Sequence, residues 1–140
     1  MVDMDALSVA LKKEVEAATQ PIIIDGHYSH DLIHNPTNVI VLRKAPWELH
    51  EILQNRLYSY EKVWENLEAE IMGVIMEETR ENYPDEIIHE CDTTDKTPEE
   101  SVEEIITVIN KEVKPHIEPI DWVTYPETLR VLVNRTCTLS

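Results

Sequence analysis

Residues 38–54, NVIVLRKAPWELHEILQ, place a short apolar run directly before the start of a helix. The run Val39–Leu42 is continuous and rich in β-branched residues, which is typical of a strand buried on both faces of a parallel sheet. Pro46 stands where a first helical residue favours proline, and apolar residues then repeat at helical spacing over 49–53. A strand that leads into a helix is the repeating unit of an α/β fold.

The same alternation extends in both directions along the chain. Helices are predicted over 3–18, over 62–82 and from the Thr97 capping box to Val113, and strands over 21–24 and 86–91. This pattern predicts a parallel sheet between two layers of helices, a three-layer α/β/α domain.

The composition disfavours several classes of protein. The chain carries 12 basic and 28 acidic side chains, a net charge of −16, which argues against nucleic-acid binding through bulk charge. No apolar run approaches the roughly 18 residues that span a bilayer, and the first residues do not resemble a secretory signal. With Gly26 and Gly73 as its two glycines, the sequence holds neither a GxxxxGK[ST] phosphate loop nor a dinucleotide loop. Cys91 and Cys137 lie far apart, which suits a reducing cytosol.

Polar residues follow each predicted strand, at the edge where parallel sheets bind ligands. These are Asp25 and His27 after the first strand, Arg43 after the second, and 92–94 after the third. An aspartate that closes an apolar strand matches the Walker B arrangement, in which the carboxylate orients waters around the Mg²⁺ of a nucleotide. The alternative is that Asp25 is an ordinary turn former.

Scarce cations gather around a break between two predicted helices. Arg43, Arg56 and Lys62 are suited to clamp phosphate oxygens, because a guanidinium pairs with them bidentately. The alternative is a set of ordinary ion pairs with nearby glutamates of the same region: Glu61, Glu65 and Glu68.

A group of histidines offers a different function. His27, His30 and His34 have spacings of three and four residues, which on a helix would place metal ligands on one face. The neighbouring Gly26 and Pro36 disfavour a regular helix there, and no cysteine or paired glutamate completes a site.

Three stretches carry a more specific likeness: PIIIDGHYSHDLI (21–33), RLYSYEKVWENLEAEI (56–71) and DTTDKTPEE (92–100). Together they resemble the archaeal family of putative adenylate kinases, whose eukaryotic relative is adenylate kinase isoenzyme six, the coilin-interacting nuclear ATPase. The likeness runs from Val2 to Trp122. It implies a P-loop-kinase-like fold, transfer of phosphate between ATP and AMP with Mg²⁺, slow ATP hydrolysis, and a cytoplasmic role in small-subunit ribosome maturation with a ribosomal protein partner.

The resemblance also assigns residues. Asp25 and His27 match the Walker B carboxylate and its companion histidine, and Arg56 matches a lid arginine that contacts ATP within a lid over about 55–65. Lys96 falls near a position beside the adenine. Ile52 stands where a second lid arginine is usual.

On the same resemblance, residues 1–122 form the carboxyl-terminal portion of a nucleoside monophosphate kinase domain. Family chains begin with a strand, a phosphate loop and an AMP-binding segment that have no counterpart here, so the sheet is expected to be incomplete at its amino-terminal side and the chain inactive alone. Residues 123–140 are expected to be disordered or to form a short strand at Leu129–Val133. Two other functions stay open: a non-catalytic ribosome-assembly protein and a metal-binding protein that uses the histidines.

Overall fold

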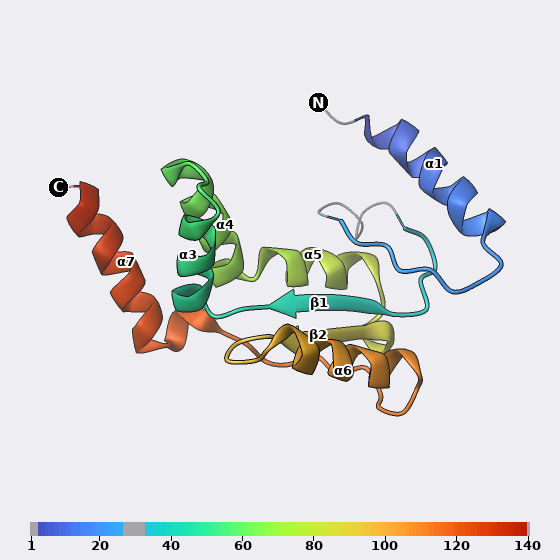
Figure 1. The fold of residues 1–140 in the computed structure, drawn as a ribbon. Helices are drawn as coiled ribbons and strands as arrows, with labels where there is room; N and C mark the ends of the chain where they lie inside the picture. The colour runs from blue at the N-terminus through green and yellow to red at the C-terminus, as the bar shows by residue number, and fades with distance from the viewer. Residues whose placement is uncertain (1–2, 27–32, 140) are drawn as a thin grey trace.

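The computed structural model describes residues 3–26 and 33–139. Its centre is a sheet of two parallel strands, β1 (Val39–Arg43) and β2 (Ile88–Asp92). Helix α5 (Val74–Asn82) lies on one face of this sheet and α6 (Pro98–Ile109) on the other (Figure 1). The predicted α/β class, with a parallel sheet between helices, is therefore confirmed.

Three helix starts follow the capping residues in the sequence. The Asp3 side chain accepts a hydrogen bond from the Ala6 N–H at 3.1 Å and begins α1 (Met4–Ala17). Pro46 is the first residue of α3 (Pro46–Asn55), and the Thr97 hydroxyl accepts from the Glu100 N–H at 3.2 Å before α6. The first N–H groups of a helix have no partner within the helix. The Asp3 and Thr97 side chains accept from one such group each, and Pro46 has no N–H that would need a partner.

The long helix predicted over 62–82 is two helices. Helix α4 (Tyr60–Met72) ends at Gly73, and α5 begins directly after it. Gly73 has a φ of 66°, a left-handed conformation that glycine adopts without the steric cost of a Cβ. The prediction of one continuous helix is wrong because this glycine ends the first helix and redirects the chain.

The strand predicted over 21–24 is also wrong, since the chain there is irregular. The side chains of Ile22 and Ile23 are 48% and 84% exposed. A strand buried on both faces needs a neighbour for its backbone groups and helices over its side chains. Among the described residues β1 pairs with β2 alone, so the segment has no strand beside it.

The carboxyl-terminal residues form a helix in place of the expected disorder or short strand. A 3₁₀ turn, η2 (Trp122–Thr124), leads into α7 (Pro126–Leu139). Thr128 and Val131 are buried, one helical turn apart, while Leu129 and Val133 are exposed. That expectation is wrong because Pro126 suits the first turn of a helix and the helical spacing turns Val131 toward α3 and α4.

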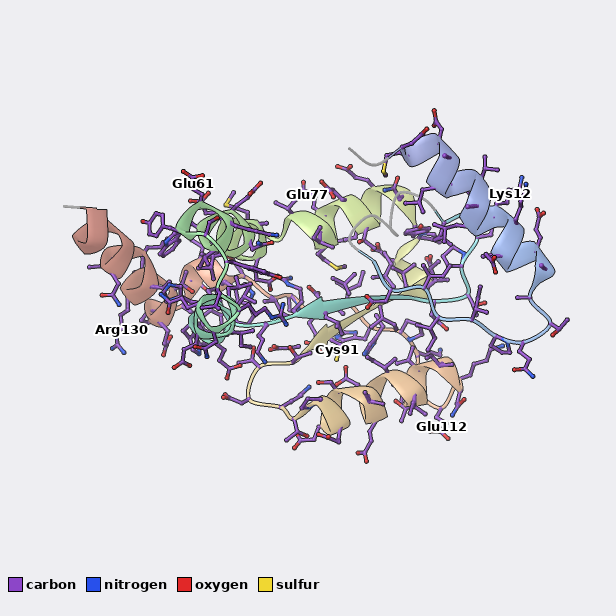
Figure 2. All side chains as sticks on the ribbon, turned by 45° about the horizontal axis from the view of Figure 1, so that its top comes forward. Lys12, Glu61, Glu77, Cys91, Glu112 and Arg130 are labelled. Carbon is purple, nitrogen blue, oxygen red and sulfur yellow. The ribbon has the colours of Figure 1, made fainter. Side chains whose placement is uncertain are left out.

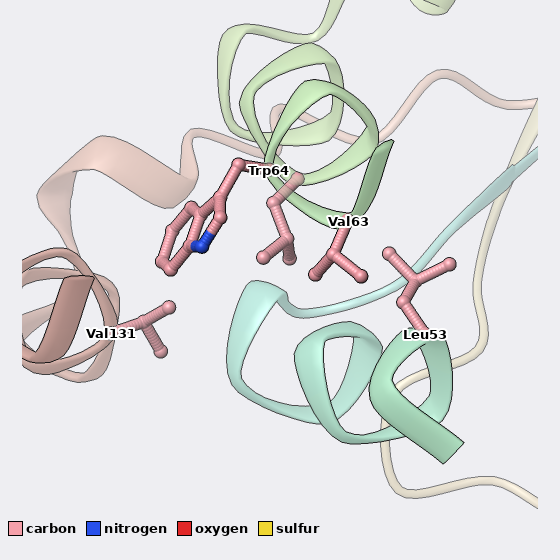
Figure 3. Close-up of a cluster of buried hydrophobic side chains, with 5 residues drawn as sticks. Leu53, Val63, Trp64 and Val131 are labelled. Atoms are coloured by element: carbon pink, nitrogen blue, oxygen red, sulfur yellow. The ribbon is translucent and has the colours of Figure 1, made fainter. Parts of the chain in front are cut away.

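Helices α3, α4 and α7 share one apolar core. Figure 3 shows Leu53, Val63, Trp64 and Val131 converging between these helices. The region expected to form a lid, 55–65, is therefore the turn and the first part of a helical hairpin that α7 supports from one side. None of the helices within residues 3–26 and 33–139 is long and apolar enough to span a bilayer.

Candidate functional site

The loops that follow β1 and β2 are joined into one rim at the carboxyl end of the sheet. The backbone N–H and the hydroxyl of Thr93 both donate to the Arg43 carbonyl, at 2.8 and 2.7 Å. The Thr94 hydroxyl accepts from the Ala45 N–H at 2.8 Å, next to the start of α3. The polar residues after the second and third predicted strands therefore meet at one edge, at which open parallel sheets bind ligands, whereas Asp25 follows no strand.

Arg43 does not serve as a free phosphate clamp. Its side chain is 4% exposed, and its guanidinium pairs with Glu70 at 2.8 Å and with Glu90. Burial lowers the pKa of Arg43, but the charges and hydrogen bonds of the two carboxylates raise this pKa by a larger amount. The net shift of the pKa is therefore upward. Arg43 is thus held in ion pairs, as the alternative expected, but its partners are Glu70 and Glu90 in place of Glu61, Glu65 and Glu68.

Glu90 is the buried acid of this group. Burial raises its pKa, and the Arg43 guanidinium opposes that shift. Its Oε2 accepts from Arg43, and a backbone hydrogen bond from Glu118 also lowers the pKa. A buried carboxylate held by one guanidinium links the two strands through their side chains as well as their backbones.

A second polar network lies on the opposite face of β2, between this strand and α6. The Glu104 carboxylate accepts from Lys96 Nζ at 3.2 Å and from His89 Nε2 at 2.8 Å. His89 Nδ1 accepts from the His116 N–H at 3.1 Å, so Nε2 carries the ring proton. Burial raises the pKa of Glu104, but hydrogen bonds from Cys91, His89 and Lys96 outweigh it and lower the pKa to about 2.

Cys91 belongs to the same network and is fully buried (Figure 2). Burial and the adjacent Glu104 carboxylate raise the pKa of its thiol to about 12. A thiol that stays protonated at neutral pH is a poor nucleophile, so the interpretation of Cys91 as a small buried residue is confirmed.

The residues assigned by resemblance come from separate segments. Asp25 is exposed in irregular chain, and His27 lies outside the described residues. Arg56 is exposed at the turn between α3 and α4, and Lys96 pairs with Glu104 beside α6. No hydrogen bond or ion pair joins Asp25, Arg56 and Lys96 to one another, so their assignments stay predictions.

The other predicted site residues, Lys62 and the histidines, also do not form one site among the described residues. Lys62 lies in the first turn of α4, with its Nζ 4.5 Å from the centre of the Tyr58 ring. Of the three histidines proposed as metal ligands, His34 is described, and His27 and His30 lie outside the described residues. Within residues 3–26 and 33–139, no group of three or more metal-ligating side chains could hold an ion.

Four residues of these networks are not among the predicted site residues, although two local signals point to some of them: Glu70, Glu90, His89 and Glu104. His89 and Glu90 interrupt an apolar strand, and a charge inside a buried strand requires a partner. Glu104 lies on the inward face of α6 between Ser101 and Val108, which are both buried. Glu70 carries no such signal, because α4 has other glutamates that face solvent.

Curated relatives identify the family of the chain, although no family model matches it. A "Putative adenylate kinase" of Thermococcus gammatolerans is 42% identical over 121 residues, which cover 86% of this chain and 65% of the relative. Proteins of the same name from Pyrococcus furiosus and Thermococcus kodakarensis are 39% and 41% identical, over 91% and 94% of this chain.

The chain spans about two thirds of the length of these relatives: 65%, 68% and 71% of the three. The matched region includes both strands and the helical hairpin, and the likeness is spread along almost the whole chain. On this similarity, the chain belongs to the archaeal "Putative adenylate kinase" family.

Proposed function

We propose that this chain is the lid-bearing part of an adenylate-kinase-type phosphotransferase, which converts ATP and AMP into two ADP and hydrolyses ATP slowly. The observation that carries the proposal is the 39% and 41% identity to relatives named adenylate kinase, across 68% and 71% of their length. The rim at the carboxyl end of β1 and β2 supports it, because that edge is where nucleotides bind in open parallel sheets.

Within this proposal four residues have roles. Asp25 orients the waters of the nucleotide-bound Mg²⁺, and His27 assists it during phosphoryl transfer. Arg56, at the tip of the helical hairpin, contacts the ATP phosphates, and Lys96 lies beside the adenine. Transfer depends on positioning and on charge stabilisation at the phosphates, so each residue acts by holding or neutralising a group.

The described residues favour a contact between Asp25 and Mg²⁺ that passes through water molecules. Asp25 is an exposed carboxylate, the hard oxygen donor that Mg²⁺ accepts, yet no described group offers three metal-ligating side chains together. Mg²⁺ would therefore arrive with ATP and keep several of its waters, while Asp25 orients those waters.

The test joins this chain to the part of a relative that lies outside the matched region. The amino-terminal segment of the T. gammatolerans relative is fused to this chain, and ADP formation is followed in a coupled assay with ATP, Mg²⁺ and varied AMP. We expect AMP-dependent ADP formation from the fusion and none from the 140-residue chain. A folded fusion that binds ATP but forms no ADP on addition of AMP would show that the proposed reaction is wrong.

A role in small-subunit ribosome maturation, with a ribosomal protein partner in the cytoplasm, forms part of the same proposal. The net charge of −16 supports it, since an acidic surface attracts basic ribosomal proteins and steers their association. The measurement is recovery of small-subunit proteins with the tagged chain from an archaeal extract at low and high salt. Recovery without any AMP-dependent activity in the fusion would favour the alternative of a non-catalytic assembly protein.

A further inference from the structure

The described chain packs around two separate apolar cores. One, between β1, β2 and α5, contains Val41, Met76, Tyr83 and Ile88. The other is the core of α3, α4 and α7, built on Trp64 and Leu67. The first group of elements, together with α6, is called the sheet unit, and α3, α4, η2 and α7 are called the helical unit. The two units lie end to end in Figure 1.

Between residues 39 and 139 the chain passes from one unit to the other three times. The first passage is at Lys44 and Ala45, between β1 and α3, and the second is at Gly73, between α4 and α5. The third leads through Asp121 into η2. Gly73 is suited to a pivot, because its left-handed φ of 66° breaks the helix cleanly between two rigid segments.

One residue, Glu70, contacts all three passages, through its carboxylate at the first and third and through its backbone carbonyl at the second. Glu70 Oε1 accepts from Arg43 Nε at 2.8 Å and from the Lys44 N–H at 3.2 Å, at the first passage. It also accepts from Trp122 Nε1 at 2.8 Å, at the third passage. Glu70 lies in the last turn of α4, and its carbonyl accepts from the Gly73 N–H at 3.1 Å, at the second.

This junction is polar, whereas each unit has its own apolar core. Arg43 and Trp122 are 4% and 2% exposed, and the guanidinium carbon of Arg43 lies 6.0 Å from the centre of the Trp122 ring. Buried ion pairs contribute less to stability than apolar packing does, but their hydrogen bonds define an orientation. Units joined by a small polar contact move relative to each other unless such bonds hold them.

We propose that Glu70 is a latch: its carboxylate holds the helical unit in one orientation on the sheet unit, and its release lets the helical unit turn about Gly73. Release would move the α3–α4 turn, with Arg56, relative to the rim formed by the ends of β1 and β2. The movement itself does not depend on the proposed kinase function; only its effect on nucleotide turnover rests on that function.

The test measures the distance between the units without nucleotide. Spin labels are attached at Leu57→Cys, a residue 92% exposed at the tip of the helical unit, and at Glu103→Cys, exposed on α6. Cys137 is replaced by serine, and Cys91 stays because it is buried. Pulsed electron paramagnetic resonance then gives the distribution of label separations, and circular dichroism confirms that each variant keeps its helices.

In Glu70→Ala we expect a distribution about twice as wide as in the parent, because the carboxylate that accepts from both Arg43 and Trp122 is then lost. Trp122→Phe, which keeps an aromatic ring but removes the indole donor, should broaden it less. Glu65→Ala, an exposed glutamate on the same helix, should leave the parental width unchanged.

Parental widths in folded Glu70→Ala and Trp122→Phe would overturn the latch. If Glu70→Ala fails to fold, Trp122→Phe decides alone, and a parental width in that variant overturns the proposal. Since no nucleotide is present, an inactive fusion in the kinase assay leaves this result unaffected.

Discussion

Replacing Glu104 by glutamine should lower the free energy of unfolding at neutral pH, and this decrease should be smaller at acidic pH. The pKa of Glu104 is lowered from 4.5 to about 2 by Cys91, His89 and Lys96 acting against burial. At about 1.4 kcal/mol for each pKa unit, this difference corresponds to roughly 3 kcal/mol. Because the side chain is 34% exposed, solvent screening reduces the expected effect to about 1–2 kcal/mol.

The sign of the pH dependence follows from the direction of the shift. A carboxylate whose pKa is lower in the folded state stabilises the fold above its unfolded pKa, and this contribution is lost as the pH falls through the folded value. For Glu104 the loss therefore begins near pH 4.5 and is complete only below about pH 2. At pH 3.5 the difference between parent and Glu104→Gln should be about a third to a half smaller than at pH 7.

The assay is urea unfolding of the parent, Glu104→Gln and Glu103→Gln at pH 7, 5 and 3.5. Glu103 is the matched control, an exposed glutamate on the same helix whose replacement should change the free energy of unfolding by less than about 0.5 kcal/mol. Titration of the Glu104 carboxyl carbon by NMR provides the direct check. A midpoint near 4.5, or equal destabilisation at pH 7 and pH 3.5, would refute the reasoning.

Other predictions concern the core of the helical unit and the proposed reaction. Val131→Ala removes two buried methyl groups and should lower the free energy of unfolding by about 2 kcal/mol, measured in urea, whereas exposed Val133→Ala should have almost no effect. The 140-residue chain alone should turn over fewer than about 1 ATP per second in the coupled assay, since the principal phosphate cradle is absent from its sequence. In the fusion with the amino-terminal segment, Arg56→Ala should reduce kcat/KM by about tenfold or more through lost charge stabilisation. Asp25→Ala in the same fusion should abolish the Mg²⁺-dependent activity, and unchanged rates in both variants would contradict the residue assignments.

Much of the fold could be predicted because local signals and tertiary packing agree. The apolar run at Val39–Leu42 became β1, and Ile87 and Ile88 marked the start of β2 to within two residues. Pro46 and Thr97 defined two helix starts, because their effect is confined to the first turn. Where a single residue determines the local backbone conformation, the sequence alone predicts where the helix begins.

Prediction failed where distant packing decides between two local possibilities. Residues 129–133 have a composition that suits a strand, yet they form part of α7 because Val131 packs against Trp64 and Leu67. Residues 21–24 suit a buried strand but have no strand beside them among the described residues. The composition of a segment favours one secondary structure, but the elements that pack beside the segment determine which structure forms.

The junction between the units was beyond prediction for a similar reason. Glu70 is one of several glutamates on α4, and nothing in its local sequence distinguishes it from Glu65 or Glu68. Its partners Arg43 and Trp122 are 27 and 52 residues away in the chain. Only the folded arrangement brings these donors to one carboxylate.

The way in which α7 completes the helical unit has a consequence for synthesis on the ribosome. The buried residues in the core of the sheet unit all precede residue 89, with the partly buried Ile117 packed against them, whereas the core of the helical unit includes Val131. Since domains fold as their residues emerge, the α3–α4 hairpin would leave the ribosome with part of its apolar surface, including Trp64, still uncovered. The nascent chain would therefore be most prone to aggregate after β2 has paired and before α7 arrives, and a stop codon in that interval would yield a sheet without a finished helical unit.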